Sequence, residues 1–240
     1  KKIFKKHKYD YVIHLAAQAG VRKSISDPTI YLNSNIVGFY NVLKICNEEN
    51  VKHFLFASSS SVYGKSKKFP LSETDITDTP ESFYAATKKS NEILGHSFSE
   101  IYKIPITALR FFTVYGEYGR PDMAPFKFTK NIANGQEIDL YNGGDHYRDF
   151  TYIDDVTEAI IKLIPKVPND KKLPFRIINI GSGKTIKISK FVKLIEKKVS
   201  KKAKINHLPM QTGDVHKTQA NVQKLTRIIK KKKFTSIEQG

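Results

Sequence analysis

The chain has 240 residues, of which 40% are hydrophobic, and its formal net charge at pH 7 is +18. This length allows one large domain or two small ones around a buried core. The single cysteine, Cys46, excludes an internal disulfide framework and is typical of a reducing compartment, so we expect a cytoplasmic protein. The longest apolar runs are far shorter than a membrane span, so we expect no membrane as a partner.

The excess of positive charge raises the question of a nucleic-acid partner. Only six of the 41 basic residues are arginines, the side chain that base readout and bidentate phosphate recognition favour. The lysines are spread along the chain, and no basic motif is interleaved with aromatic residues. We interpret the charge mainly as solvated surface and expect no nucleic acid as a partner, with a nucleic-acid binder as the minority alternative.

Short apolar runs and helical patterns alternate along the first half of the chain. In chain order, the patterns predict a strand at 11–15, a helix at 27–49, a strand at 52–57, a helix at 82–102 and a strand at 106–112. This alternation is typical of a parallel sheet covered by helices, which is an α/β fold.

The second half of the chain continues the alternation less regularly. The patterns predict a loop at 115–122, a helix at 124–133, a strand at 138–141, a turn at 142–145, a helix at 154–163, a strand at 177–180 and a helix at 189–199. The lysine-rich tail that follows predicts no element. The run Gly181–Thr185 resembles a phosphate loop, but Ile178 stands where a Walker motif needs glycine, so we interpret the run as a turn.

Three Tyr/Lys pairs have the four-residue spacing that places both side chains on one helix face: Tyr40/Lys44, Tyr63/Lys67 and Tyr84/Lys88. Tyr40 lies among apolar helix neighbours and Lys67 lies in a lysine-rich loop, so packing and solvation explain these two pairs. Tyr84 lies near a helix start, downstream of a strand that ends in the serines at 58–61. That strand end is expected at the carboxyl edge of the sheet, where ligands bind. The context favours Tyr84 and Lys88 for proton transfer, with an ordinary helix-surface pair as the alternative.

Several motifs together resemble the extended short-chain dehydrogenase/reductase family of nucleotide-sugar epimerases and dehydratases. They are SSSVYG at 59–64 with YxxxK at 84–88, HLAAQAGVR at 14–22, LRFFTVYG at 109–116, RDFTYIDD at 148–155 and PMQTGDV at 209–215. The resemblance covers nearly the whole chain. Three of these motifs, together with GRPDM at 119–123, are most similar to UDP-glucuronate 4-epimerases.

The resemblance implies a catalytic trio of Ser59, Tyr84 and Lys88, with NAD as cofactor. Tyr84 would exchange the proton of the sugar 4-hydroxyl, Ser59 would hydrogen-bond the reacting oxygen, and Lys88 would hold the nicotinamide ribose. To act as a base near pH 7, a tyrosine must lower its pKa by about 3 units, which is about 4 kcal/mol. A lysine cation about 4 Å away supplies roughly that amount, so we expect Lys88 to lower the pKa of Tyr84.

The resemblance also implies binding residues. The cofactor would contact Leu15, Ala16, Ala17, Gln18, Ser34, Ser58 and Phe112, as well as Tyr84 and Lys88. The UDP-sugar would contact Ser60, Ser61, Thr113, Arg120, Arg148, Gln211 and Asp214. Arg120 is the candidate for the C5 carboxylate of a uronic acid, because a guanidinium matches a carboxylate bidentately. A loop arginine paired with a surface carboxylate is the alternative. His146 and His216 show no metal-ligand spacing, and no metal is expected.

The implied fold is a doubly wound, Rossmann-like parallel-sheet domain with a smaller α/β substrate domain. The first would comprise 1–114 and 148–183, and the second 115–147 and 184–240. No Gly-rich dinucleotide loop is present, and relatives continue beyond the last residue, so we expect both domains to be incomplete and the chain to be a fragment. Relatives commonly pair through a helix bundle, so we expect a homodimer for the full-length protein.

The expected function is an NAD-dependent 4-epimerase that interconverts UDP-glucuronate and UDP-galacturonate through a 4-keto intermediate. The alternatives are a UDP-glucose/UDP-galactose 4-epimerase, another nucleotide-sugar epimerase or dehydratase, and, in a different class, an inactive fragment or non-catalytic binding protein. Family dehydratases usually carry Asp-Glu where this chain has Ser60 and Ser61, and UDP-glucuronate decarboxylases carry Glu at the second position. The two serines argue against both reactions.

Overall fold

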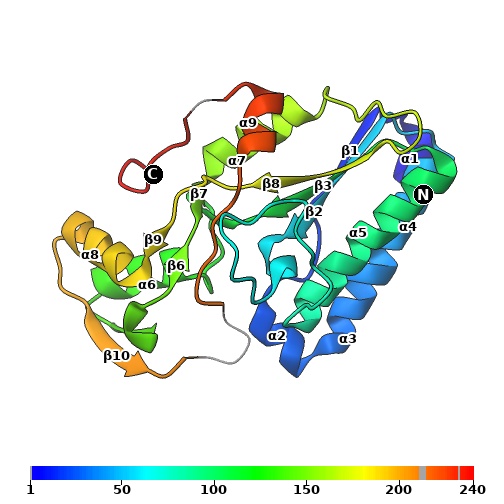
Figure 1. Ribbon diagram of the computed structural model, residues 1–240. Helices are drawn as coiled ribbons and strands as arrows, with labels where there is room; N and C mark the ends of the chain where they lie inside the picture. Colours follow the sequence, from blue (N-terminus) through cyan, green and yellow to red (C-terminus); the bar gives the residue numbers. More distant parts are fainter. Residues whose placement is uncertain (1, 211–214, 232) are drawn as a thin grey trace.

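The computed structural model describes residues 2–210, 215–231 and 233–240. Figure 1 shows a larger part, built around a central sheet with helices on both faces, and a smaller part that contains α6, α8 and β10. No helix in these described ranges is long and apolar enough to cross a membrane.

The central sheet has four parallel strands in the order β1-β2-β3-β8. Their bounds are Tyr11–His14 for β1, His53–Ser59 for β2, Ile106–Phe111 for β3 and Phe175–Ile180 for β8. The register places Ser58 opposite Arg110, which in turn lies opposite Asn179. Because all four strands run in one direction, their carboxyl ends meet at one edge of the sheet, where α/β proteins bind ligands.

Helices cover both faces of this sheet (Figure 1). The bounds are Gly38–Glu48 for α4 and Phe83–Tyr102 for α5 on one face, and Ile153–Leu163 for α7 and Gln223–Ile229 for α9 on the other. In β2, Phe54 and Phe56 pack with α4, whereas Leu55 packs with α7 and α9. Successive strand residues point to opposite faces, so a strand buried on both faces needs a continuous apolar run. The predicted α/β parallel-sheet fold is confirmed.

Local signals explain where the helices begin. The predicted helix at 27–49 consists of α3 (Pro28–Tyr31), a π-helical segment at Leu32–Val37 and α4. Asp27 caps α3 by accepting a hydrogen bond from the Ile30 backbone N–H (3.5 Å), and Pro28 occupies the first helical position. Ser82 caps α5 in the same way, because its Oγ accepts from the Ala85 N–H (3.1 Å). The π-helical segment was not predicted from the sequence.

The smaller part has its own core. The strands β5 (Glu137–Tyr141) and β10 (Lys204–Leu208) pair in parallel, and the helices α6 (Ala124–Ala133) and α8 (Ile188–Val199) pack beside them. Two short ladders accompany this core: β4 (Thr113–Tyr115) with β7 (Phe150–Tyr152), and β6 (Tyr147–Arg148) with β9 (Ile186–Lys187). The remaining described elements are α1 (Lys2–Lys6), α2 (Val21–Ser26) and the 3₁₀ turns Ser60–Tyr63 and Asn142–Gly144.

The lysine-rich tail contains two elements that the sequence patterns did not predict, β10 and α9. Leu225 and Ile229 of α9 are buried on the central sheet, so part of the segment 184–240 packs with the larger part of the molecule. The division of the chain into a cofactor domain and a substrate domain stays a prediction.

Candidate active site

The structure brings Ser59, Tyr84 and Lys88 together at the carboxyl edge of the sheet. Tyr84 lies in the first turn of α5, Lys88 lies one turn later, and Ser59 is the last residue of β2. The Ser59 side chain lies close enough to the Tyr84 hydroxyl to lower the pKa of the tyrosine, although burial raises that pKa overall. The Ser59 Oγ also accepts a hydrogen bond from the Ser61 backbone N–H (3.1 Å). The catalytic role of the three residues stays a prediction, but their predicted proximity is what the structure shows.

Lys88 is buried, with 4% of its surface exposed, and its Nζ donates a hydrogen bond to the Ala57 carbonyl (2.8 Å). Burial lowers the pKa of Lys88 to about 8. An ammonium group has three N–H donors. The one that binds Ala57 fixes the side chain and leaves donors for a ligand.

The expected lowering of the Tyr84 pKa by Lys88 is not what the structure shows. Burial raises the pKa of Tyr84 above its usual value, and the Ser59 hydrogen bond and the positive charge of Arg120 partly oppose this rise. Arg120, rather than Lys88, is therefore the cation that acts on the tyrosine, while the Lys88 ammonium is directed at the Ala57 carbonyl.

The residues predicted to contact the cofactor surround this edge. Leu15, Ala16 and Ala17 follow β1 and are exposed, Gln18 and Ser34 are half-buried, and Ser58 and Phe112 are buried. These groups fit a nicotinamide nucleoside. The buried ammonium of Lys88 can donate hydrogen bonds to the ribose, and the apolar ring of Phe112 can contact the nicotinamide ring, while the exposed residues after β1 are accessible to the cofactor. The cofactor contacts themselves stay predictions.

Asn35 is a residue of this edge that the sequence analysis missed. Its side chain exchanges two hydrogen bonds with the backbone of Gln18 (2.8 and 3.0 Å) and donates to the Thr87 hydroxyl (3.0 Å). Thr87 in turn donates to the Tyr84 carbonyl (2.8 Å). Asn35 therefore joins the loop after β1 to the first turn of α5. The adjacent Ser34 is the residue for which a cofactor contact was predicted, and the two residues differ in the direction that the π-helical segment gives their side chains.

The residues predicted to contact the sugar lie beside the trio. Ser60 and Ser61 begin the 3₁₀ turn after β2, Thr113 begins β4, and all three are half-buried. Arg120 lies in the following loop, close enough to lower the pKa of Tyr84. Its guanidinium binds the Asp122 carboxylate through Nε (3.0 Å) and Nη2. The alternative interpretation of Arg120, an arginine paired with a surface carboxylate, therefore describes the structure as it stands.

Tyr31 is a further side chain at this edge. Its hydroxyl donates to the carbonyl of Gly20 (2.9 Å), and its ring lies edge-on to that of Tyr84, with 6.2 Å between the ring centroids. A Cβ on Gly20 would lie 3.5 Å from the Tyr31 hydroxyl and 3.6 Å from Nη2 of Arg120. The loop after β1, Tyr31 and Arg120 therefore lie close together, and the ring of Tyr31 connects them to Tyr84.

Arg148 was predicted to contact the UDP-sugar. Its Nη1 donates to the carbonyls of Tyr147 (3.0 Å) and His216 (3.3 Å), so it lies beside the chain that continues from the predicted substrate-binding segment. Gln211 and Asp214, the other two predicted contacts, lie outside the described residues.

Asp149, another residue that the sequence analysis missed, holds this region together. Its buried carboxylate accepts hydrogen bonds from the backbone N–H groups of Ser182, Gly183 and Ala220 (2.8, 3.0 and 3.0 Å). Burial raises the pKa of Asp149, although these hydrogen bonds lower it. The N–H groups of the glycine-rich run after β8 are therefore directed at a carboxylate of the chain itself.

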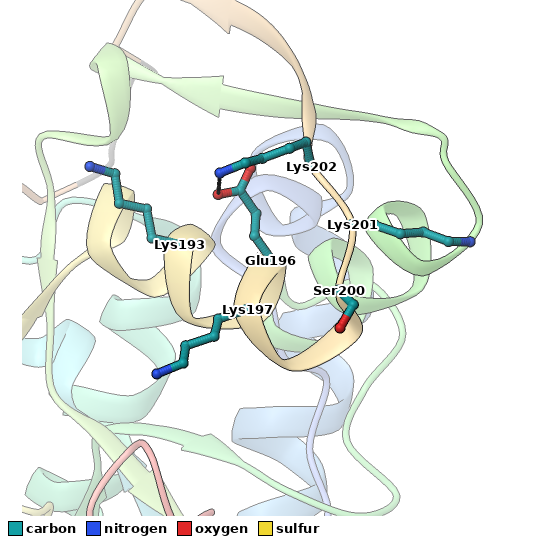
Figure 2. Close-up of a pocket in the computed structure, with 6 residues that line it drawn as sticks. All are labelled: Lys193, Glu196, Lys197, Ser200, Lys201 and Lys202. Carbon is teal, nitrogen blue, oxygen red and sulfur yellow. Dashed lines mark ion pairs between the residues drawn. The ribbon is translucent and has the colours of Figure 1, made fainter.

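The positively charged surface includes a pocket of about 530 Å³ at the end of α8 (Figure 2). Its lining residues are Lys193, Glu196, Lys197, Ser200, Lys201 and Lys202. Glu196 pairs with Lys202 (3.5 Å), whereas the other lysines extend outward in Figure 2. None of the predicted site residues lines this pocket, and we interpret it as solvated surface. In the described ranges, no three His, Cys, Asp or Glu side chains are grouped as metal ligands.

Residues 1–181 match the NAD dependent epimerase/dehydratase family. Protein CapI of Staphylococcus aureus is 47% identical over 252 residues, which cover 100% of this chain and 75% of that protein. A probable UDP-glucuronate 4-epimerase of Rhizobium meliloti is 44% identical over 245 residues, which cover 96% of this chain and 72% of that protein.

Solved structures agree with this similarity. A UDP-glucuronic acid 4-epimerase from Bacillus cereus, in complex with UDP-glucuronic acid and NAD, has a TM-score of 0.91 and 32% identity, covering 100% of this chain and 74% of that chain. A UDP-glucose 4-epimerase from Thermotoga maritima, with UDP-glucose, has a TM-score of 0.91 and 30% identity, covering 100% of this chain and 77% of that chain. Since one family matches most of the sequence and its relatives share both the fold and the full span of the chain, this protein belongs to the NAD-dependent epimerase/dehydratase family of enzymes, with NAD as its cofactor.

Proposed function

We propose that the protein is a nucleotide-sugar 4-epimerase that interconverts UDP-glucuronate and UDP-galacturonate. The observation that carries the choice of substrate is the position of Arg120 near Tyr31 and Tyr84. Burial raises the pKa of both tyrosines, and the positive charge of Arg120 partly opposes this rise. The C5 carboxylate of a uronic acid is adjacent to the 4-hydroxyl that the proposed base contacts, so a cation beside this base can pair with that carboxylate. The similarity to the probable UDP-glucuronate 4-epimerase of Rhizobium meliloti and to the UDP-glucuronic acid 4-epimerase of Bacillus cereus supports this choice.

NAD, when bound, supplies the hydride acceptor and donor for C4 of the sugar. Tyr84 removes the proton of the 4-hydroxyl and later returns it, and Ser59 holds the Tyr84 hydroxyl and the reacting oxygen in one hydrogen-bonded group. Lys88 contributes hydrogen bonds to the cofactor ribose, because its side chain is fixed by Ala57 and retains free donors. Ser60, Ser61 and Thr113 contact the sugar, and Arg148, Gln211 and Asp214 contact the UDP portion.

The pairing of Arg120 with Asp122 is compatible with substrate binding. The two side chains are 44% and 62% exposed. An ion pair this exposed contributes about 0–1 kcal/mol. A substrate carboxylate that is partly removed from water beside Tyr84 forms a stronger charge-assisted pair with Arg120. It can therefore replace Asp122 at the guanidinium, or share the guanidinium with Asp122, at little cost in free energy.

Replacing Arg120 tests the substrate. Hydrogen bonds to charged groups contribute about 1.5–3 kcal/mol, so Arg120→Ala should lower kcat/KM for UDP-glucuronate by roughly 10- to 150-fold. The same change should lower kcat/KM for UDP-glucose much less, because glucose has no carboxylate. The measurement is steady-state kinetics on both sugars with the natural protein that carries this chain. Arg227→Ala, an exposed arginine of α9, is the control, and equal losses on the two sugars would remove the uronate assignment.

The second candidate is a UDP-glucose/UDP-galactose 4-epimerase. The Arg120–Asp122 pair favours it, because the guanidinium already has a carboxylate partner in the structure. The similarity to the Thermotoga maritima enzyme is of the same order as that to the Bacillus cereus enzyme. This candidate predicts that Arg120→Ala has similar effects on both sugars, because Arg120 then influences the reaction only through the pKa of Tyr84.

The proposed active form is a homodimer that pairs through α4 and α5. Several apolar side chains of these two helices are exposed: Tyr40, Ile93, Ile101 and Tyr102. The ring of Phe98 connects Tyr40 on α4 with Tyr102 on α5, since it lies 6.1 Å from the Tyr40 ring and 5.1 Å from the Tyr102 ring between centroids. A contiguous apolar surface on neighbouring helices is typical of a subunit interface.

A further inference from the structure

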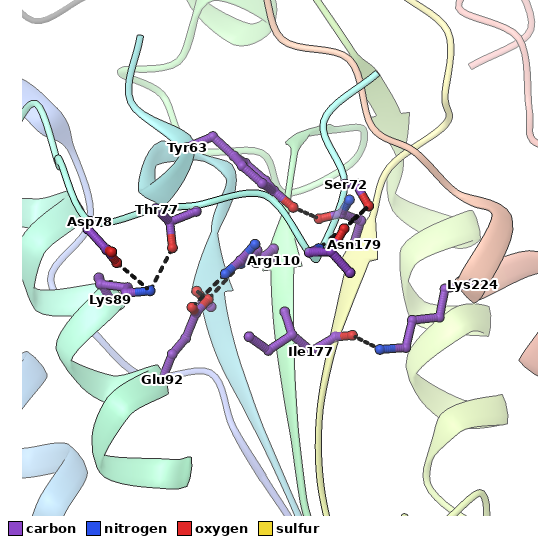
Figure 3. A network of polar contacts seen from close by, with 12 residues as sticks. Tyr63, Ser72, Thr77, Asp78, Lys89, Glu92, Arg110, Ile177, Asn179 and Lys224 are labelled. Atoms are coloured by element: carbon purple, nitrogen blue, oxygen red, sulfur yellow. Dashed lines mark hydrogen bonds and ion pairs between the residues drawn. The ribbon is translucent and has the colours of Figure 1, made fainter. Parts of the chain in front are cut away.

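A buried ion pair lies beneath the proposed catalytic edge, between Glu92 of α5 and Arg110 of β3 (Figure 3). Their side chains are 3% and 1% exposed. The contact is bidentate, with Nε of Arg110 donating to Oε1 and Nη2 donating to Oε2, both at 2.8 Å. Such a pair has a defined geometry as well as a favourable energy.

Glu92 connects the two elements that carry the proposed catalytic residues. It follows Lys88 by four residues and Tyr84 by eight on α5, so the three side chains share one helix face. Its Oε1 also accepts a hydrogen bond of 2.6 Å from the hydroxyl of Ser58, the residue immediately before Ser59. One carboxylate therefore fixes the helix of Tyr84 against the strand of Ser59.

Arg110 extends the same network to the turn that carries the serines. Its guanidinium lies over the ring of Tyr63, 4.7 Å from the centroid, and Tyr63 ends the 3₁₀ turn that begins at Ser60. The Tyr63 hydroxyl donates to Oδ1 of Asn179 on β8 (2.6 Å). Figure 3 shows the Glu92–Arg110 contact and the Tyr63–Asn179 contact as dashed lines. The position of the guanidinium over the Tyr63 ring connects the two contacts.

Stability alone does not account for this ion pair. Well-packed apolar residues of similar volume often replace a buried pair without loss of stability, because both charges must be removed from water. Apolar contacts, however, tolerate small shifts between a helix and a strand, whereas directional charge-assisted hydrogen bonds do not. Nη1 of Arg110 also has no hydrogen-bond partner among the described residues. Burying such an unpaired donor lowers the free energy of unfolding, so the arginine is not explained by stability alone.

We propose that Glu92 is a positioning residue, which together with Arg110 holds Tyr84 of α5 in place against Ser59 of β2. Glu92 fixes α5 against β2 through Ser58, and Arg110 fixes the serine turn through Tyr63. The inference rests on the proposed function, in which the Tyr84 hydroxyl exchanges the proton of the sugar. It also requires that the position and the pKa of Tyr84 depend on the Glu92 carboxylate, which lies two helical turns away.

The test separates position from stability by removing both charges together, in the natural protein that carries this chain. In the double variant Glu92→Leu with Arg110→Met, we expect thermal unfolding close to that of wild type, kcat lowered by roughly 10- to 100-fold and KM for the UDP-sugar nearly unchanged. The exposed pair on the same helix, Glu100→Leu with Lys103→Met, is the matched control and should leave kcat unchanged. A folded Glu92/Arg110 variant with wild-type kcat would overturn the proposal.

A second readout does not depend on which sugar is turned over. The Tyr84 pKa, followed by NMR of ¹³C-labelled tyrosine, should be higher in the double variant, because the Ser59 hydrogen bond lowers this pKa and is no longer held in place. Ser58→Ala keeps the Glu92–Arg110 ion pair and removes only the hydrogen bond from Ser58 of β2 to Glu92. This variant should also raise the Tyr84 pKa. An unchanged Tyr84 pKa in Ser58→Ala contradicts the proposal, even where the double variant does not fold. A failure of the substrate assignment alone leaves this titration unaffected.

Discussion

Tyr84 is subject to opposing influences that decide whether it can act as a base. Burial raises its pKa, and the Ser59 hydrogen bond and the Arg120 charge lower it. The two groups that lower the pKa are also the two that the proposed substrate contacts. The proton affinity of Tyr84 is therefore coupled to the presence of substrate beside it, which is the coupling that a reversible proton transfer needs.

Replacement of the tyrosine hydroxyl tests this role. Tyr84→Phe keeps the ring that packs edge-on against Tyr31 but removes the proton acceptor. We expect kcat to fall by about 10²- to 10⁴-fold, with the Kd for the UDP-sugar, measured by calorimetry, within about two-fold of wild type.

Tyr40→Phe is the matched control, since Tyr40 belongs to another Tyr/Lys pair with the same spacing and is 41% exposed on α4. It should leave both constants unchanged. Turnover that survives in Tyr84→Phe would show that another group is the base.

The residues of the site differ in how far the sequence could predict them. Helix spacing and the strand end upstream predict that Tyr84 and Lys88 lie near the serines at 58–61, whereas the choice of Ser59 among these serines depends on the family resemblance. Glu92 lies at the next helical position after Lys88, so its signal was present, but no pattern marks a buried carboxylate before the partner strand is known. Its partner Arg110 is 18 residues away in sequence and meets it only through the sheet register.

At the scale of elements, His53 joins three parts of the sheet region. It is fully buried at the start of β2, with Nδ1 2.9 Å from the Ile164 carbonyl and Nε2 2.8 Å from the Thr107 hydroxyl. A carbonyl can only accept, so Nδ1 carries the proton and Nε2 accepts from Thr107, which in turn accepts from Arg176 (2.9 Å). Burial lowers the pKa of His53 to about 4, so the neutral ring is the folded form.

This histidine predicts a loss of stability in acid. Between pH 6.5 and 4 the unfolded chain binds a proton at His53 that the folded protein does not, so stability is present above pH 6.5 and is lost as the pH falls toward 4. The shift from 6.5 to about 4 corresponds to about 3 kcal/mol. Urea unfolding at pH 7, 5.5 and 4 should show a flatter pH dependence in His53→Gln than in wild type. The exposed residue His7, changed to Gln, is the control, and equal slopes in wild type and His53→Gln would contradict the assignment.

Elements with strong periodicity were predicted to within a few residues, and elements without it were missed. The helix predicted at 124–133 coincides with α6, and the one at 82–102 differs from α5 by one residue. In contrast, β10 depends on pairing with β5, a partner more than sixty residues away, and α9 has only seven residues. Long-range pairing, rather than local propensity, determines such segments.

At the scale of the whole molecule, the apolar surface of α4 and α5 predicts self-association. Light scattering coupled to size exclusion should give a dimer for the natural protein. Tyr40→Glu combined with Tyr102→Glu should give a monomer with unchanged circular dichroism, because two charges would be buried in the interface. Ile161→Glu, at an exposed apolar position of α7 on the other face of the sheet, is the control and should remain dimeric. A monomeric wild type would contradict the proposed pairing.

The proposed reaction can be followed directly, because the two UDP-sugars give different NMR signals. The natural protein that carries this chain is incubated with UDP-glucuronate and NAD, and the sugar is followed by ¹H NMR. The account predicts that signals of UDP-galacturonate appear and reach a constant ratio to those of UDP-glucuronate, and that the same ratio is reached from UDP-galacturonate. Unchanged UDP-glucuronate, under conditions in which the same protein converts UDP-glucose to UDP-galactose, would contradict it.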